Sequence, residues 1–132
     1  MNATQKYTIE LTEEQMRLVS RCVEDCCRFA AGQTELWNTT SWCNMENDIE
    51  VINKLKELHD LVVPGLDYNE SYSWDGGNCP NENQRKFIAQ CYSLYREILH
   101  FFAVKNNTHN VYEDPTLTCE EGGPLPVIKE VE

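Results

Sequence analysis

Apolar residues recur every three or four positions over three stretches of the chain, and this spacing predicts three amphipathic helices. The first is expected to begin after Thr12, which with Gln15 has the pattern of a capping box, and to run to about Ala31. Gly32 is suited to end this helix, because glycine adopts a left-handed cap without strain. The apolar face is expected to consist of Met16, Val19, Val23, Cys26 and Ala30.

A second helix is expected to start near Asn47 or Asp48 and to stop at Pro64. The residues that would form its buried stripe are Ile49, Ile52, Leu55, Leu58 and Val62. The stretch before this helix follows no single period: Leu36, Trp37 and Trp42 indicate burial, whereas the run Asn-Thr-Thr-Ser at 38–41 indicates a turn.

The third predicted helix is the most apolar of the three. It is expected to start near Asn81, with Gln84 completing a second capping box, and to end at Asn106-Asn107. Apolar residues cover more than half of its circumference, so we expect it to lie at the centre of the fold or in a subunit interface. Its stripe consists of Ile88, Cys91, Tyr92, Tyr95, Ile98, Leu99 and Phe102.

Both ends of the chain have features of short strands. Residues 7–11, Tyr-Thr-Ile-Glu-Leu, alternate between apolar and polar side chains, as a half-buried strand does. Residues 110–112 and 126–131 are further candidates, and the last of these is expected to pair with 7–11. The sequence therefore predicts a single α+β domain over 1–132, with three main helices and a small sheet made from the N-terminal and C-terminal strands.

The charge of the chain is more unusual than its composition. The apolar fraction of 41% and the charged fraction of 25% are ordinary for a globular protein, but 22 acidic residues against 11 basic ones give a net charge of -11. Phosphate-backbone binding requires clustered Lys and Arg, so we expect no nucleic-acid partner. Acidity of this kind suits either a basic protein partner or solubility alone.

No stretch has the length of apolar sequence that a membrane span needs, and the first residues lack the apolar region of a signal peptide. We therefore expect a cytoplasmic protein without a membrane partner. The Asn-x-Ser/Thr triplets are interpreted as chance matches in an Asn-rich chain; they begin at Asn2, Asn38, Asn69 and Asn106.

Seven cysteines occur without a Cys-x-x-Cys pair, and an odd number in a chain without a signal peptide argues against a disulfide framework. Cys22 and Cys26 have the spacing of two zinc ligands on a helix, but no histidine completes the set. We interpret Cys22, Cys26 and Cys91 as small buried apolar residues, and expect neither a metal nor a cofactor.

No catalytic signature is present. The acidic residues at 13–14 and 24–25 are interpreted as a solvated surface, because adjacent carboxylates on a helix point in different directions. No nucleophile turn surrounds any cysteine, and the glycine loop at 75–78 lacks Gly-Lys-Ser/Thr and is interpreted as a plain turn. The chain is expected to be a binding protein and not an enzyme.

The stretch 69–74, Asn-Glu-Ser-Tyr-Ser-Trp, is the strongest candidate for a binding segment. Pro-Gly precedes it and Asp-Gly-Gly follows it, so it lies in a loop. Aromatic residues in a polar loop of a small domain are commonly used to bind a ligand. Tyr72 and Trp74, with Tyr112, would stack on a base. Arg28, Arg85 and Arg96 are each able to bind phosphate or to lie on the solvated side of a helix, and Arg96 is selected for the site. The alternative for the aromatic residues is packing over the rim of the core.

Several short motifs occur in order along the chain. They are Leu11-Thr12 with Gln15, Gly32-Gln33, Asn69 with Ser71-Tyr72, Tyr92 and Tyr95 with His100, Val111-Tyr112, and Leu125-Pro126. In this order they resemble a widespread family of small phage-encoded proteins of unassigned activity. The high cysteine content and the stretch 37–43 depart from the family pattern.

The resemblance implies a phage origin and the cytoplasm of an infected bacterium. We expect an anti-defence protein that sequesters a nucleotide-derived messenger, either a cyclic nucleotide or an ADP-ribose derivative, within a homo-oligomer. The residues expected to bind this ligand are Gln33, Asn69, Ser71, Tyr72, Trp74, Arg96, His100 and Tyr112. Two alternatives remain: an acidic inhibitor that binds a host defence factor as a decoy, and an enzyme that acts on a nucleotide.

Overall fold

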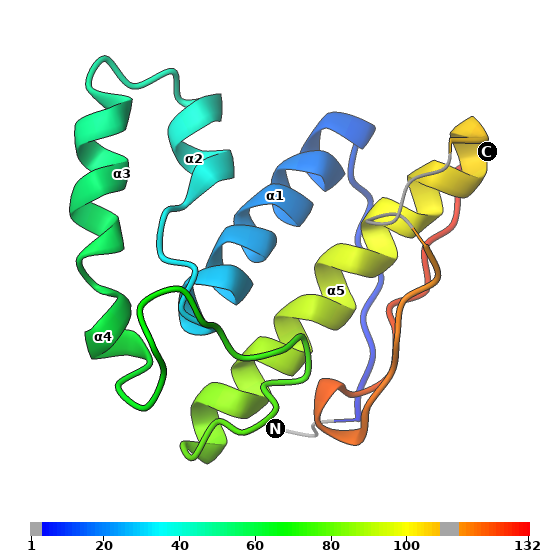
Figure 1. The fold of residues 1–132 in the computed structure, drawn as a ribbon. Coiled ribbons are helices and arrows are strands. Elements are labelled where there is room, and N and C mark those ends of the chain that lie inside the picture. The colour runs from blue at the N-terminus through cyan, green and yellow to red at the C-terminus, as the bar shows by residue number, and fades with distance from the viewer. Residues whose placement is uncertain (1–3, 109–113) are drawn as a thin grey trace.

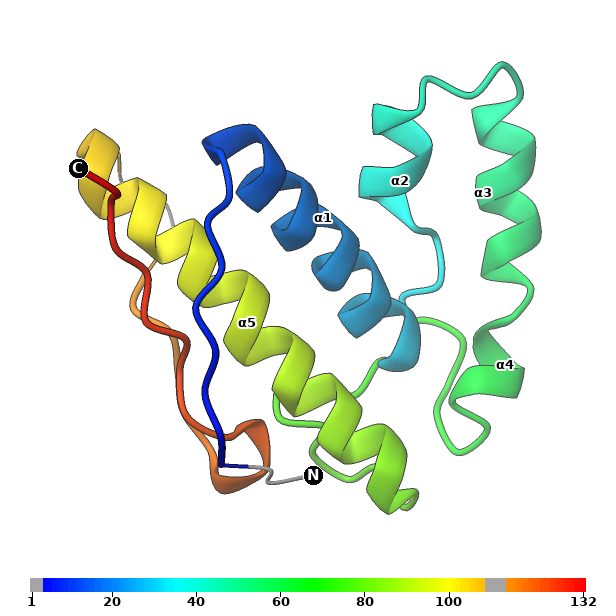
Figure 2. The ribbon, with the colours of Figure 1, turned by 180° about the vertical axis from the view of Figure 1, so that it is seen from behind.

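Two long antiparallel helices form the centre of the molecule. The computed structural model describes residues 4–108 and 114–132, and α1 and α5 run side by side in it (Figures 1 and 2). Three shorter helices lie on one side of α1, and the extended ends of the chain run beside α5. The helical elements are α1 (Glu13–Ala30), α2 (Trp37–Trp42), α3 (Asp48–Lys56), α4 (His59–Val62), α5 (Glu82–Asn106) and the 3-10 turn η2 (Glu120–Gly122).

Two hydrogen bonds show the register of α1 against α5. The Cys27 thiol donates to the Ile88 carbonyl at 3.4 Å, and the Ser20 hydroxyl donates to the Tyr95 carbonyl at 3.2 Å. Each step covers seven residues, about two helical turns, in opposite directions along the two helices. The core lies between these helices and the loop after α4, and its buried members are Cys27, Ala31, Val63, Tyr72, Cys79, Ile88, Tyr92 and Tyr95.

The predicted ends of α1 are confirmed. Gln15 N–H donates to the Thr12 hydroxyl and Thr12 N–H donates to the Gln15 side chain, which completes the capping box. Gly32 follows the helix at φ 108°, and a Cβ there would lie 2.9 Å from a methyl group of Val63. Glycine is therefore required both for the backbone conformation and for the close approach of Val63 at the end of α4.

The predicted α+β class is wrong, because residues 4–108 and 114–132 contain helices and turns but no strand. Residues 7–11 are extended, yet Tyr7 is 89% exposed and Ile9 is 77% exposed. Pro126 removes one backbone N–H donor from the expected partner strand, and Pro124 removes another just before it. The candidate strand 110–112 lies outside the described residues.

The C-terminal segment is held to α5 by side chains in place of a sheet. Glu121 accepts from Arg85 Nε at 2.9 Å, and Glu130 pairs with Lys105 Nζ at 2.9 Å. Gly122 approaches α5 so closely that a Cβ would lie 2.5 Å from the Ser93 hydroxyl. These contacts fix residues 114–132 along α5, where they form one wall of the pocket described below.

The expected second helix is divided into α3 and α4. In a continuous helix the Leu55 carbonyl would accept from the N–H of His59. Here it accepts from the N–H of Leu58 at 3.0 Å and from the Thr34 hydroxyl at 2.6 Å, so the helical pattern stops. The division also changes the expected stripe: Ile52 is buried, but Ile49 is 71% exposed.

A helix replaces the turn that was expected at 38–41. This helix, α2, begins at Trp37 without a cap from its own side chains. The Asp25 carboxylate on α1 supplies the cap, accepting from the Asn38 and Thr39 N–H groups at 3.1 and 2.6 Å and from the Thr39 hydroxyl at 2.6 Å. Asp25 is therefore buried, whereas we expected a solvated acid, and both Trp37 and Trp42 remain at least 42% exposed.

The N-terminus of α5 confirms one half of the predicted capping box. The Asn81 side chain accepts from Gln84 N–H at 2.9 Å. The Gln84 amide does not return to Asn81 but donates to the carbonyls of Ala30 at 2.8 Å and Val62 at 3.0 Å. Because these carbonyls belong to the last turns of α1 and α4, one side chain joins the ends of three helices.

The cysteines follow a different pattern from the one expected. Cys22 and Cys26 are exposed and Cys91 is half-buried, while Cys27 and Cys79 are buried. No helix among the described residues is long and apolar enough to cross a membrane.

Candidate functional site

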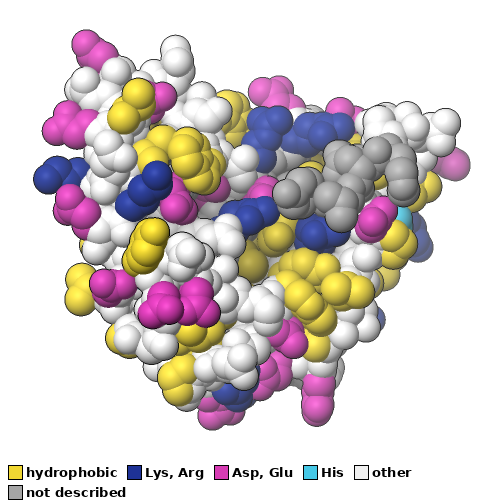
Figure 3. Space-filling model, in the orientation of Figure 1, with side chains coloured by type: hydrophobic (Ala, Val, Ile, Leu, Met, Phe, Trp, Pro, Cys, Tyr) yellow, Lys and Arg dark blue, Asp and Glu magenta, His cyan; other side chains and the backbone are white. Residues whose placement is uncertain are grey.

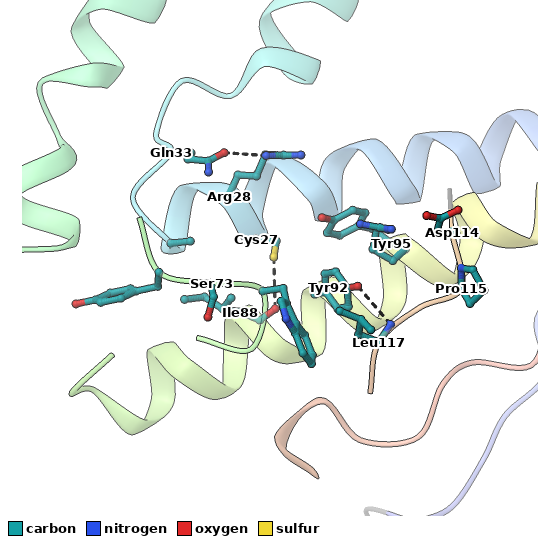
Figure 4. A pocket seen from close by; sticks show the side chains of 14 residues that line it. Cys27, Arg28, Gln33, Ser73, Ile88, Tyr92, Tyr95, Asp114, Pro115 and Leu117 are labelled. Carbon is teal, nitrogen blue, oxygen red and sulfur yellow. Dashed lines mark hydrogen bonds between the residues drawn. The ribbon is translucent and has the colours of Figure 1, made fainter. Parts of the chain in front are cut away.

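A pocket of about 420 Å³ lies between α1, α5, the loop after α4 and the segment that begins at Asp114 (Figure 4). Six of its fourteen lining residues come from the two long helices, and the antiparallel register positions these side chains. The residues that line it are Cys27, Arg28, Ala31, Gln33, Tyr72, Ser73, Trp74, Ile88, Tyr92, Tyr95, Arg96, Asp114, Pro115 and Leu117.

Three aromatic rings form a continuous wall. Trp74 lies 4.9 Å from Tyr92, centroid to centroid, and Tyr92 lies 5.9 Å from Tyr95 in an edge-to-face arrangement. The Tyr92 hydroxyl accepts from Leu117 N–H at 3.3 Å, which fixes the ring against the C-terminal segment. Trp74 is half-buried, so part of its indole is accessible to a planar ligand.

A hydrogen-bonded chain crosses one side of the pocket. Arg28 Nε donates to Glu24 at 2.9 Å and Arg28 Nη1 donates to the Gln33 side-chain oxygen at 2.8 Å. The Gln33 amide then donates to the Ser71 hydroxyl at 3.2 Å. The guanidinium is thus held before any ligand arrives, and the loop that carries Ser71 is tied to the end of α1.

A second guanidinium comes from α5. Arg96 lies over the Tyr92 ring, with Cζ 5.4 Å from the ring centroid, and is half-buried. In Figure 4, Gln33 and Arg28 lie on one side of the pocket and Asp114 on the other, with Tyr92 and Tyr95 between them. The pocket therefore combines two cations with aromatic faces and one carboxylate.

Burial keeps the Cys27 thiol and the Tyr95 phenol of the wall neutral. Desolvation, with a smaller effect of nearby Cys91, raises the pKa of Cys27 to about 12. Desolvation likewise raises the pKa of Tyr95 to about 12. A thiol with this pKa carries almost no thiolate at neutral pH, so Cys27 is not an activated nucleophile.

Burial and the neighbouring Glu24 have opposite effects on Arg28. Desolvation by itself would lower the pKa of its guanidinium, but the hydrogen bond and charge of Glu24 outweigh desolvation and raise that pKa above its ordinary value. The guanidinium therefore stays charged in the pocket wall, where it can bind an anion.

The structure brings together four of the eight residues predicted to bind a ligand. Gln33, Tyr72, Trp74 and Arg96 all line the pocket, and Ser71 is hydrogen-bonded to Gln33 beside it. Tyr72 is only 7% exposed, belongs to the core and has a phenol pKa raised by burial. Its ring is therefore packed against the protein, which was the alternative to stacking on a ligand.

Besides Ser71, the predicted residues Asn69 and His100 are not among the lining residues. Asn69 is exposed in the loop, and His100 lies one turn beyond Arg96 on α5. Tyr112 lies outside the described residues.

Arg28, Tyr92 and Tyr95 line the pocket but were not among the eight residues predicted to bind the ligand. The two tyrosines belong to the apolar stripe of α5, a pattern that is equally typical of a core. A signal for Arg28 was present: it follows Glu24 by four residues, the spacing of a helical ion pair, and closely precedes Gln33.

The loop at 75–78 is a turn, as predicted. Asp75 accepts from the Ser73 hydroxyl at 2.6 Å and from Gly77 N–H at 2.9 Å. The described residues contain no group of three or more side chains arranged to hold a metal ion. No family model, curated protein or solved structure matches the chain.

Proposed function

We propose that the protein binds and sequesters a nucleotide-derived signalling molecule of a bacterial defence system, without turnover. The motifs shared with small phage-encoded proteins support a phage origin and action in the cytoplasm of the infected bacterium. The single observation that carries the binding function is the pocket in which Arg28 and Arg96 flank an aromatic wall.

The pocket suits a nucleotide in size and chemistry. Its volume of about 420 Å³ lies within the range of small-molecule sites. A base can stack against the accessible part of Trp74, and a guanidinium can bind a phosphate through two parallel N–H groups. Gln33 and Asp114 supply hydrogen-bonding groups for a base edge or a ribose hydroxyl.

Sequestration without reaction agrees with the state of the wall. The Cys27 thiol and the Tyr95 phenol both have a pKa of about 12, so neither is poised to transfer a proton at neutral pH. Binding that removes a messenger requires affinity alone. We also expect the protein to form a homo-oligomer. Sedimentation equilibrium would measure the mass of this oligomer.

The test is thermal melting and calorimetry with adenosine monophosphate, cyclic AMP, cyclic di-AMP and ADP-ribose. A ligand at 100 times its Kd should raise Tm by roughly 10 °C, because it binds only the folded state. Arg96→Gln should weaken binding about tenfold or more by removing charge-assisted hydrogen bonds. Lys86→Gln removes the same charge on an exposed part of α5 and should leave affinity unchanged.

Two results would contradict the proposal. If none of the four nucleotides shifts Tm or gives heat of binding, the pocket does not take this class of ligand. If a ligand binds but is recovered in altered form after the protein is denatured, the protein is an enzyme and not a sponge.

A second function, inhibition of a host protein by an acidic surface, is favoured by one feature of α3. A hollow along this helix, near the exposed Ile49, has more acids than bases in its lining: Glu46, Asp48, Glu50 and Glu57 against Lys54. Acids that surround an apolar contact are what a decoy for a basic surface requires. Protection of phage from defence that is lost with Ile49→Ser and kept with Arg96→Gln would favour this function over sequestration.

A further inference from the structure

Three of the five arginines lie along one face of α1. Arg17, Arg21 and Arg28 are separated by four and seven residues, which places them within an arc of about 40° on the helix. At a rise of 1.5 Å per residue, their Cα positions are about 6 Å and 10 Å apart along the helix axis, and the stripe covers about 16 Å. This arginine stripe, Arg17 to Arg28, ends at the pocket, because Arg28 is one of the lining residues.

Arg17, Arg21 and the pocket residue Arg96 each stack on an aromatic ring. The distance from Cζ to the ring centroid is 4.6 Å for Arg17 over Phe102, 4.7 Å for Arg21 over Trp42 and 5.4 Å for Arg96 over Tyr92. A ring covers the face of a guanidinium, whereas its N–H donors lie in the plane and point to the edges. Stacking therefore orients a cation for an anion that approaches edge-on.

The acidic neighbours of the stripe contact its arginines at a single nitrogen. Glu13 pairs with Arg17 Nε at 3.2 Å, and Glu24 pairs with Arg28 Nε at 2.9 Å. These i,i+4 ion pairs reduce the local positive charge, but each is formed at the Nε end of the fork. The Nη groups carry four of the five N–H donors of a guanidinium, and on Arg28 one of these four already donates to the Gln33 side chain.

The distribution of charge on this face contrasts with the whole chain. The net charge is -11, yet Figure 3 shows Lys and Arg side chains gathered over α1 and α5, beside the recess between these two helices. An anion attracted to this acidic protein would be directed there, since interactions beyond about 8–10 Å are screened at physiological salt.

We infer that the pocket and the arginine stripe form one site for a nucleotide with at least two phosphodiester groups separated by a nucleoside, such as a cyclic or linear dinucleotide. This rests on the proposed function and specifies its ligand. One nucleoside occupies the pocket beside Trp74, its phosphate meets Arg28 or Arg96, and the next phosphate reaches Arg21.

The spacing of the stripe favours separated phosphates over adjacent ones. The two phosphorus atoms of a pyrophosphate share one bridging oxygen, so such a ligand meets the arginines at the pocket and leaves Arg21 and Arg17 unused. A mononucleotide does the same. Phosphates on either side of a nucleoside are separated by a sugar, and the long side chains of Arg28 and Arg21 can converge on them across a step of about 10 Å between their Cα positions.

The test is calorimetry with cyclic di-AMP, cyclic AMP and ADP-ribose on the full chain and its variants. We expect cyclic di-AMP to bind at least tenfold more tightly than the other two. Arg21→Gln should lower the affinity for cyclic di-AMP about tenfold and leave that for cyclic AMP unchanged, because only the dinucleotide reaches the stripe. Arg21→Lys should retain part of the additional affinity for cyclic di-AMP, since lysine keeps the positive charge but lacks the paired N–H donors of a guanidinium.

Lys86→Gln is the matched control, because it changes the net charge equally away from the stripe. Arg21→Lys serves as the second variant if Arg21→Gln melts below the temperature of the experiment, because it changes the same contact and keeps the charge. Equal affinities for the three probes, with no effect of either variant, would overturn the inference while the proposed function stands. Binding of none of the probes would overturn both.

Discussion

Tyr92 and Tyr95 belong both to the core and to the pocket wall. They are 4% and 6% exposed, and their rings meet edge to face. The same two side chains therefore close the interior of the protein and form the surface available to a ligand. Stability and binding cannot be separated at these two positions.

Tyr95→Ala should lower the free energy of unfolding by about 3–5 kcal/mol, because it removes a buried ring and leaves a cavity. Phe87→Ala is the matched comparison: this ring is on the same helix but 45% exposed, and its loss should have a clearly smaller effect. Urea unfolding measures both. Equal losses would show that the Tyr95 ring is not a core residue.

His59 connects the loop after α4 to the rest of the protein. It is buried, and its ring nitrogens lie 2.7 Å from the Glu70 carbonyl oxygen and 2.9 Å from the Asp60 carboxylate. Both neighbours are acceptors, so only the doubly protonated ring can donate to both. The hydrogen bond to Glu70, followed by that to Asp60, raises the pKa of His59 above its ordinary value of 6.5.

This raised pKa predicts a loss of stability with rising pH. The folded protein binds the proton more tightly than the unfolded chain, so the contribution of His59 is fully present below pH 6.5 and disappears as pH passes through the folded-state pKa. Urea unfolding between pH 6 and pH 9 should show this decline. In His59→Gln the decline should be smaller; a variant with an unchanged slope would mean that another group is responsible.

At the scale of elements, α2 depends on a carboxylate from another helix. Asp25 accepts the two N–H groups at its start and the Thr39 hydroxyl, and α2 in turn supplies the Trp42 ring on which Arg21 stacks. A change in α1 at Asp25 would therefore reach the arginine stripe through α2.

Asp25→Ala should destabilise the protein by about 2–3 kcal/mol, because it leaves buried donors without acceptors. Helical circular dichroism should fall by about one short helix. Glu46→Ala, which removes an exposed acid, should change neither quantity appreciably. An Asp25 variant with unchanged helicity and stability would show that α2 does not need this cap.

The elements predicted correctly are those whose signals are local. Thr12, Gln15 and Gly32 lie within a few residues of the ends they define, and so does Asn81. The break after α3 could not be predicted, because the Thr34 hydroxyl that takes the Leu55 carbonyl is 21 residues away in the chain. The strands were predicted from alternation alone, which does not show whether a hydrogen-bonding partner exists.

The same distinction applies to the candidate site. Polar residues at loop positions, such as Gln33, could be selected from sequence because the core does not require them. Tyr92 could not be distinguished from an ordinary core residue, since periodicity is identical for both roles. The arginine stripe has a visible period in the sequence, but the rings beneath it come from α2 and α5 and appear only in the fold.

The molecule as a whole has two candidate binding surfaces, and they differ in charge. The α1–α5 pair carries the pocket and the arginine stripe, while α3 carries an acidic hollow on the other side of α2. The two proposed functions therefore use separate surfaces, and a variant on one surface can be interpreted without reference to the other.

The Gln84 amide gives this architecture a modular character. Val62 precedes the loop that contains Trp74 and Gln84 follows it, so their hydrogen bond closes the base of that loop, with Ala30 as a third attachment. The exposed residues of this loop can therefore be changed while the helices that carry the cations keep their positions, provided that Val63, Tyr72 and Cys79 keep their places in the core. Substitutions at exposed residues within 63–81 would change which ligand the pocket prefers and leave the arrangement of the helices as it is.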